Sequence, residues 1–392
     1  MTVEGVPTVG SVAGADAARI AADRRSALCA RVRELGLGAY YCRSTSDIRW
    51  ATSFDAVFDT ESAHLMLVSG DDTVVHTDSR YSEAMLGHPS RGSLEISEER
   101  VSHAAFAAAR IAEQASPSDD GIVHVGVEPT ITLAEYRMLD QALSEKGLRY
   151  AIEMTADPVD GLRRVKDASE IALLRHAQQI TDQAFAELLG WVHAGMTEKE
   201  VANELEYAMR KLGATGLAFS TIAASGPHSS MPHAVPSDRE LGQGEFVVLD
   251  FGAKYGDYCA DMTRTIAIGE PTAEMRRIYE TVLEAQTECK KAIEPGVQNR
   301  SMHELADKII SDAGYAGRFT HSLGHGVGID IHESPYLSPK SPDTLSQGNV
   351  VTVEPGIYVP GIAGVRIEDY GVVVDGGFDT FTKSPHELQI VG

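Results

Sequence analysis

The sequence is short of positive charge. Its 392 residues include 34 Lys and Arg against 57 Asp and Glu, which gives a formal net charge of −23 at pH 7. Nucleic acids and anionic membranes are bound through basic patches, so this deficit argues against both as partners. Long apolar runs are also missing, since no stretch approaches the roughly 20 residues of a membrane span. We therefore expect no nucleic-acid or membrane partner.

Cysteine pairs and targeting signals are missing as well. The four cysteines are scattered, with no C-x-x-C pair, which is typical of reduced thiols in a cytosol. The N-terminal stretch MTVEGVPTVGSVAGADAARIAADRR lacks the basic segment and apolar core of a signal peptide. Hydrophobic residues make up 43% and charged residues 23%, as in an ordinary globular protein. We predict a soluble, cytoplasmic protein.

A chain of this length favours two domains. Residues 156–167, ADPVDGLRRVKD, combine Pro, Gly and a charge cluster, as a connection does. Before them, β-prone runs such as HLMLVSG and GIVHVGVEP alternate with Ala-rich helical stretches, which indicates an α/β domain. After them, helices are followed by strands with glycine-rich turns, which indicates an α+β domain. We predict an N-terminal α/β domain at residues 1–157 and a C-terminal α+β domain at residues 158–392.

Three helices are predicted in the C-terminal half. Apolar residues fall near helical spacing through IALLRHAQQITDQAFAELLGWV, from about residue 168 onward. A second helix begins with a capping box of Thr197 and Glu200 and stops at Gly213. The third spans TAEMRRIYETVLEAQTECKKAI and ends before Pro295. After Gly242 the pattern is dominated by strands.

Four acids stand within or at the ends of apolar strands in this half: Asp250 in VVLDF, Asp261 in the run from Tyr258 through TRTIAI, Glu354 after VVTV, and Glu368 in GVRIEDYGVVV. Clustered without cations, such acids would repel one another and could not all ionise. Histidines stand nearby among the glycines of THSLGHGVGIDIHESP. An imidazole and several carboxylates are a typical ligand set for two divalent metal ions, which would explain acids in apolar strands.

Each of these residues has a simpler interpretation when it is taken alone. An Asp near a glycine turn can be a turn or edge residue, and Glu354 can simply end a strand before Pro-Gly. GHGVG has no Gly-Lys-Ser/Thr after it and no βαβ unit around it, which argues against a phosphate loop. HELAD and HESPY lack the second histidine of H-E-x-x-H, which excludes the helical single-zinc motif. These simple interpretations are independent, and all of them would have to be true at once. The combined pattern therefore favours a metal centre.

The order and context of these residues resemble the pita-bread metallopeptidases, the family of methionine aminopeptidase, aminopeptidase P and prolidase. The family's metal pattern is Asp, Asp eleven residues later, His, Glu and Glu. SLGHGVGIDIHESP resembles its histidine-containing glycine loop and His-Glu-x-Pro box, and MPHAVPSD resembles the segment that carries a further active-site histidine. SDIRWATSF and HTDSRYSEA in the first half resemble the creatinase-type N-terminal domain. The metal pattern matches Asp250, Asp261, His325, Glu354 and Glu368.

The resemblance implies a pita-bread catalytic domain that binds two divalent metal ions through these five residues. Carboxylate-rich ligation favours manganese, with cobalt, zinc and iron left open. The resemblance also implies that Glu354 carries the proton of the attacking water to the leaving nitrogen, and that His233 or His332 stabilises the oxyanion. Arg366 would hold a ligand carboxylate, and His321 would orient substrate. Relatives suggest a homodimer.

The resemblance narrows the substrate to peptides with proline at the second position. Methionine aminopeptidases lack the N-terminal domain and creatinase lacks the metal set, which leaves aminopeptidase P and prolidase. Many prolidases carry an arginine directly after the His-Glu-x-Pro box, where this chain has Tyr336. We therefore expect an Xaa-Pro aminopeptidase. The alternatives are an Xaa-Pro dipeptidase, a hydrolase of a non-peptide amide on the same metal centre, and an inactive peptide-binding module.

Overall fold

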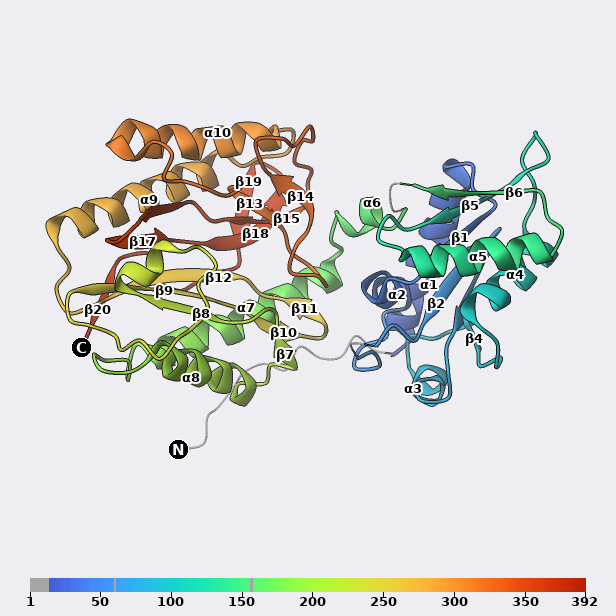
Figure 1. Ribbon diagram of the computed structural model, residues 1–392, viewed down its shortest axis with the longest axis horizontal. Helices are drawn as coiled ribbons and strands as arrows, with labels where there is room; N and C mark the ends of the chain where they lie inside the picture. The colour runs from blue at the N-terminus through green and yellow to red at the C-terminus, as the bar shows by residue number, and fades with distance from the viewer. Residues whose placement is uncertain (1–13, 60, 156–157) are drawn as a thin grey trace. The chain divides into compact units, whose positions relative to one another are not determined.

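The computed structural model describes residues 14–59, 61–155 and 158–392, which form two compact units that divide between Arg163 and Arg164 (Figure 1). The sequence placed the domain boundary between residues 157 and 158, and residue 157 lies outside the described residues. The first thirteen residues of the stretch searched for a signal peptide also lie outside them.

A six-stranded mixed sheet forms the centre of the N-terminal unit, in the order β4-β3-β2-β1-β5-β6. Strand β1 pairs antiparallel with β2 and parallel with β5, so the sheet changes direction at its middle. The strands are β1 (Ala39–Cys42), β2 (Leu65–Ser69), β3 (Asp72–His76), β4 (Glu95–Ser97), β5 (Val123–Val127) and β6 (Tyr150–Met154).

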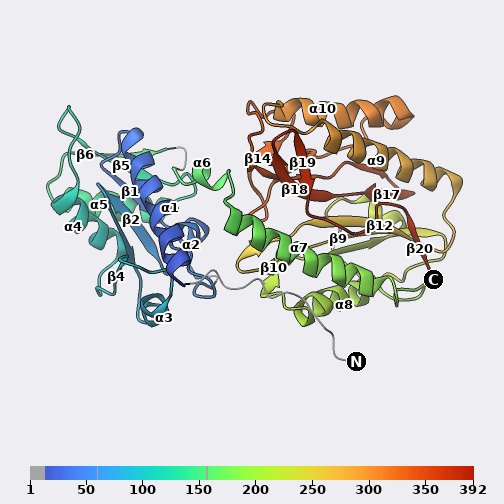
Figure 2. The ribbon, with the colours of Figure 1, turned by 180° about the vertical axis from the view of Figure 1, so that it is seen from behind.

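Helices cover both faces of this sheet, as Figures 1 and 2 show from opposite sides: α4 and α5 lie on one face, and α1 and α2 on the other. Successive strand residues point to opposite faces. Tyr41, Phe106 and Leu139 accordingly share one apolar cluster beneath α4 and α5. The predicted α/β pattern is confirmed. The helices are α1 (Gly14–Glu34), α2 (Thr45–Thr52), α3 (Ser82–Gly87), α4 (His103–Gln114), α5 (Leu133–Glu145) and α6 (Asp160–Arg163).

The C-terminal unit contains two larger sheets, of order β20-β12-β9-β8 and β14-β13-β15-β18-β19, and two smaller ones, β11-β10-β7 and β16-β17. Most neighbouring strands are antiparallel, as predicted; β20 and β12 are parallel. The strands are β7 (Gly216–Leu217), β8 (Ile222–Ser225), β9 (Glu245–Phe251), β10 (Ala253–Tyr255), β11 (Tyr258–Cys259), β12 (Met262–Ile268), β13 (Gly324–Gly326), β14 (Glu333–Leu337), β15 (Val350–Val353), β16 (Gly356–Val359), β17 (Ala363–Arg366), β18 (Asp369–Val374), β19 (Gly377–Thr380) and β20 (Gln389–Val391).

The three predicted helices are confirmed. Thr197 and Glu200 form the predicted capping box, and a second box, of Asp167 and Glu170, begins the first long helix. These devices satisfy backbone N–H groups that the first helical turn leaves without partners. A fourth helix, α10, was not expected from the sequence. The helical elements are α7 (Ala168–Leu188), α8 (Glu198–Lys211), η1 (Gly226–Ser230), α9 (Ala273–Ala292), α10 (Asn299–Ile310) and η2 (Ser311–Tyr315).

The helices form two pairs, α7 with α8 and α9 with α10, with strands between them (Figure 1). Leu249 and Phe251 of β9 belong to the apolar cluster under α7 and α8, whereas Phe246 belongs to the cluster under α9 and α10. Because side chains alternate along a strand, Asp250 shares the face of Phe246. This face points into the interior between the two helix pairs, where the other acids lie.

Two strand predictions were wrong at the acids themselves. The strand expected from Tyr258 to residue 268 is broken, and Asp261 lies between β11 and β12. Glu368 was expected inside a strand, but it lies between β17, which pairs with β16, and β18, which pairs with β15. Both acids therefore stand where the chain passes from one sheet to another.

A glycine allows the first of these breaks. A Cβ atom on Gly252 would lie 1.9 Å from the carbonyl oxygen of Ala260, so only glycine lets the segments that carry Asp250 and Asp261 approach this closely.

We predict that Gly252→Ala lowers the free energy of unfolding by about 1–3 kcal/mol, because the added methyl group overpacks the contact with Ala260. Gly377→Ala in the same unit is the control, since a Cβ there meets nothing within 4 Å. Urea unfolding of both variants measures the difference. Equal losses from the two variants would contradict this account.

Candidate active site

All nine residues predicted for the site line one pocket of the C-terminal unit, with a volume of about 510 Å³. The segments that carry them span more than a hundred residues of the chain, and they meet in the interior between the two helix pairs. The nine are His233, Asp250, Asp261, His321, His325, His332, Glu354, Arg366 and Glu368.

Three of the acids meet one imidazole at the base of the pocket. One ligand atom each from Asp261, His325 and Glu368 lies within 4.8 Å of the other two. The Nε2 atom of His325 is 3.6 Å from Asp261 and 3.3 Å from Glu354. His325 Nδ1 lies 3.1 Å from the carbonyl oxygen of Gly326, to which it donates, so Nε2 faces the acids.

Arg366 holds the fourth acid. Its Nη2 donates to Asp250 Oδ2 at 2.6 Å, and both side chains are largely buried. Its Nη1 donates to the hydroxyl of Tyr358 at 2.7 Å, and its Nε donates to Thr263 Oγ1 at 3.0 Å. The guanidinium is therefore fully committed to the walls of the site, and the carboxylate it supports is that of Asp250.

Two threonines and a tyrosine that sequence reasoning missed support these groups. Thr263 Oγ1 donates to Glu368 Oε2 at 2.7 Å. Thr352 Oγ1 donates to Glu354 Oε1 at 3.2 Å and accepts from the backbone N–H of His325. Each threonine lies two residues from a predicted site acid, so strand alternation could have indicated that it shares the acid's side of the strand.

Tyr358 links Arg366 to His321. The tyrosine hydroxyl accepts from Arg366 and donates to His321 Nε2 at 2.8 Å, while His321 Nδ1 donates to the carbonyl oxygen of Ser322. Both ring nitrogens of His321 are thus used by the protein itself. Of the other two histidines, His332 packs edge-on against His325 with 4.3 Å between ring centroids, and His233 is exposed in the turn after η1.

Burial and neighbouring charges shift the pKa values of the four acids and of His325. Burial raises the pKa of Asp250, Asp261 and Glu368, and for the latter two the neighbouring acids raise it further. Burial also disfavours ionisation of Glu354, but the His325 imidazolium beside it lowers the pKa of Glu354 to about 2. Burial opposes the charge on His325 too, and Glu354 and Asp261 nevertheless raise its pKa to about 9.

The donor set fits a pair of divalent cations. Asp250 Oδ1 is buried and has no hydrogen-bond partner among the described residues. An orphaned carboxylate oxygen is costly, as is the repulsion among the acids, and a cation between them removes both costs. Carboxylates and one imidazole are ligands that manganese and similar ions accept.

Comparison with known proteins agrees with this geometry. Residues 172–375 match the family described as metallopeptidase family M24, and residues 24–165 match the creatinase/prolidase N-terminal domain. The uncharacterized peptidase YqhT of Bacillus subtilis is 38% identical over 360 residues, which cover 91% of this chain and 97% of that protein. The Xaa-Pro dipeptidase of Pyrococcus furiosus is 40% identical over 264 residues, 67% of this chain and 75% of the relative.

A solved structure is similar over nearly the whole chain. The Xaa-Pro dipeptidase from Bacillus anthracis is 38% identical, has a TM-score of 0.86, and is aligned over 95% of this chain and 100% of its own. This chain belongs to metallopeptidase family M24. The expected pita-bread relationship is confirmed, and the protein is a peptidase rather than an inactive binding module.

In this M24 peptidase, the structure excludes a phosphate loop at GHGVG and shows a packed core thiol at Cys259. GHGVG forms strand β13 and does not precede a helix, so it is not a phosphate loop. Cys259 is fully buried and its thiol donates to the carbonyl oxygen of Ile329, as expected of a packed core thiol. None of the described helices is long and apolar enough to cross a membrane.

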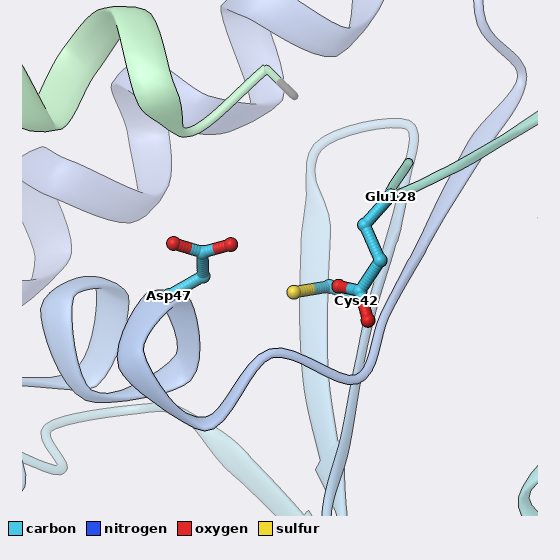
Figure 3. Close-up of side chains that lie close together, drawn as sticks. All are labelled: Cys42, Asp47 and Glu128. Atoms are coloured by element: carbon cyan, nitrogen blue, oxygen red, sulfur yellow. The ribbon is translucent and has the colours of Figure 1, made fainter. Parts of the chain in front are cut away.

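A second group with metal-ligand atoms lies in the N-terminal unit: Cys42, Asp47 and Glu128 (Figure 3). Glu128 accepts from the backbone N–H groups of Arg43 and Ser44, each at 3.0 Å. Asp47 pairs with Arg163 at 2.7 Å. Figure 3 shows the Cys42 sulfur pointing toward Asp47. We assign this group a structural role, because both carboxylates already neutralise or cap other groups.

A buried ion pair braces the turn that carries His332. Lys166 Nζ lies 2.6 Å from Glu333 Oε1, and both side chains are less than a tenth exposed. Cys259 holds the same turn from another side, since its backbone N–H donates to Gly328. These contacts at Gly328 and Glu333 therefore fix the segment that carries His332.

We predict that Lys166→Met lowers the free energy of unfolding by about 3–5 kcal/mol, because it removes the ammonium that faces the buried Glu333 carboxylate. Lys199→Met is the matched control, since its pair with Asp238 is exposed and should contribute at most about 1 kcal/mol. Urea unfolding decides between them. A loss from Lys166→Met as small as the control's would contradict the bracing role.

Proposed function

We propose that this M24 peptidase hydrolyses Xaa-Pro bonds at a centre that binds two divalent metal ions through Asp250, Asp261, His325, Glu354 and Glu368. The unpartnered Asp250 Oδ1 among converging buried acids is the observation that carries this proposal. When bound, such ions supply an activated water and polarise the scissile carbonyl. The oxygen-rich donor set supports manganese as the metal.

The protein's own groups have distinct tasks in this proposal. Glu354 can take a proton from the attacking water and pass it to the leaving proline nitrogen. His332 and His233 line the pocket, and their rings make no hydrogen bond to the described residues, so they can donate to the developing oxyanion or to substrate. Arg366 keeps Asp250 in place, and His321 acts on Arg366 through Tyr358.

Names of relatives support the dipeptide as the preferred substrate. The Pyrococcus furiosus and Bacillus anthracis proteins are both named Xaa-Pro dipeptidase, and the second is aligned with nearly this whole chain. We therefore favour an Xaa-Pro dipeptidase, the alternative in the sequence analysis, over the aminopeptidase expected there.

An Xaa-Pro aminopeptidase is the second candidate, because the pocket offers little to a free carboxylate. Among the described residues, those that line it include no lysine, and the one arginine there, Arg366, is committed to Asp250. Tyr336 stands directly after the His-Glu-x-Pro box and lines the pocket. The carboxylate of a dipeptide would have to be bound by imidazoles instead of a guanidinium.

The predicted homodimer and cytoplasmic location stay predictions.

For the metal centre, we predict that Glu368→Gln abolishes binding of at least one of two Mn²⁺ ions. Loss of a residue that only supports a metal ligand typically costs roughly 10- to 100-fold. Turnover of Ala-Pro should fall by more than this, because Glu368 is itself a proposed ligand. Calorimetric titration of Mn²⁺ and proline release measure the two effects. Glu284→Gln, on the exposed face of α9, is the control. Full activity after chelation of the metal, or in Glu368→Gln, would refute the centre.

For the substrate, we predict that the protein releases proline from Ala-Pro faster than it cleaves Ala-Pro-Ala. Tyr336→Arg should raise kcat/KM for the dipeptide by roughly tenfold, because a charge-assisted hydrogen bond to the carboxylate contributes about 1.5–3 kcal/mol. Tyr336→Phe is the control. Cleavage of the tripeptide alone would establish the aminopeptidase instead. If the protein cleaves neither peptide when the metal is present, non-peptide amides become the substrates to test.

A further inference from the structure

Arg264 of β12 is among the largest fully buried side chains of the described residues, and it lies three residues after Asp261. A guanidinium has five N–H donors, and here every one has an acceptor. Nε donates to the carbonyl oxygen of Pro385. Nη1 donates to the carbonyl oxygens of Thr263 and Glu368, at 2.9 and 2.6 Å. Nη2 donates to Ser384 O and to Asp369 Oδ1.

These acceptors lie on three separate segments of the chain. Thr263 belongs to the same strand as Arg264. Glu368 lies in the passage from β17 to β18, and Asp369 begins β18. Ser384 and Pro385 precede β20. Glu368 itself is outside both strands, so no sheet ladder fixes its backbone. Its N–H donates to Thr263 O at 3.1 Å, and its carbonyl oxygen accepts from Arg264.

Asp369 anchors the guanidinium from the other side. Its buried carboxylate accepts from Arg264, from Gln286 at 2.7 Å, from Lys290, and from His386 at 2.6 Å. Burial opposes this charge, but Arg264, His386 and Lys290 together hold the pKa of Asp369 well below its ordinary value. The carboxylate of Asp369 is therefore a fixed anion. If Arg264 were replaced, Lys290 and His386 would still bind this carboxylate.

Arg264 touches the main chain of Glu368 and not its carboxylate, which Thr263 holds. Its effect on the site is therefore one of position and not of charge. We propose that Arg264 is a positioning residue for the metal centre, which fixes the backbone of Glu368 so that its carboxylate faces Asp261 and His325. This inference rests on the metal centre described under the proposed function.

Lys290 provides a matched control, because it bonds to the same Asp369 carboxylate and makes no hydrogen bond to Glu368. Arg264→Lys and Lys290→Met each remove part of the ionic network, but only the first removes the donor to Glu368 O. Mn²⁺ alone is titrated calorimetrically into the metal-stripped full-length chain of each variant, and thermal unfolding is followed in parallel.

We expect both variants to lower Tm, and only Arg264→Lys to weaken Mn²⁺ binding, by about 10- to 100-fold. Wild-type Mn²⁺ affinity in Arg264→Lys, or the same loss of affinity in Lys290→Met, would overturn the positioning role and leave a purely structural one. If Arg264→Lys does not fold, Asp369→Asn tests the same clamp, since it weakens the charge-assisted bond that holds the guanidinium. Unchanged affinity there would also overturn it.

Glu368→Gln, titrated alongside, separates this inference from the proposed function. Strong Mn²⁺ binding by the wild type that Glu368→Gln weakens and Arg264→Lys does not would refute only the role of Arg264. Failure of the wild type to bind Mn²⁺ would refute the metal centre and this inference with it.

Discussion

Mutual repulsion among buried carboxylates is the constraint on which the site depends. Asp250, Asp261, Glu354 and Glu368 lie in one pocket, and among the described residues their close cations are Arg366 and His325. Two positive charges cannot neutralise four negative ones, so the folded chain either binds protons at these acids or binds cations. The same imbalance that makes the pocket costly for folding makes it a strong site for divalent ions.

The fold answers this constraint by holding three of the four acids individually. Arg366 holds Asp250, Thr263 holds Glu368, and Thr352 holds Glu354, so three of the four carboxylates have one oxygen fixed by a hydrogen bond from the protein. Glycine at position 252 allows the strand segments to approach closely enough for this. A centre fixed in this way loses little freedom when it binds metal or substrate, which is how preorganised sites work.

Local patterns were the part of this structure that the sequence could predict. Capping boxes, helical periodicity and strand alternation act over a few residues, so α7, α8 and the core strands followed from the sequence. The spacing of Asp250 and Asp261, read with the resemblance, gave the residues that meet in the pocket. Contacts such as those of Tyr358 with His321 and Lys166 with Glu333 join residues far apart in sequence, and no local pattern reports them. Tyr336 alone does not decide between an aminopeptidase and a dipeptidase, because one pocket residue does not fix how a carboxylate is bound.

The guanidinium of Arg264 has a consequence for the order of events during synthesis. It takes carbonyl oxygens at residues 384 and 385, and β20 then pairs with β12 beside it. The full set of Arg264 hydrogen bonds can therefore form only after residues 384 and 385 have been synthesised, which is later than all five residues of the proposed metal centre. Assembly of the proposed metal centre is thus coupled to the C-terminal strand and is not complete as soon as Glu368 has been synthesised.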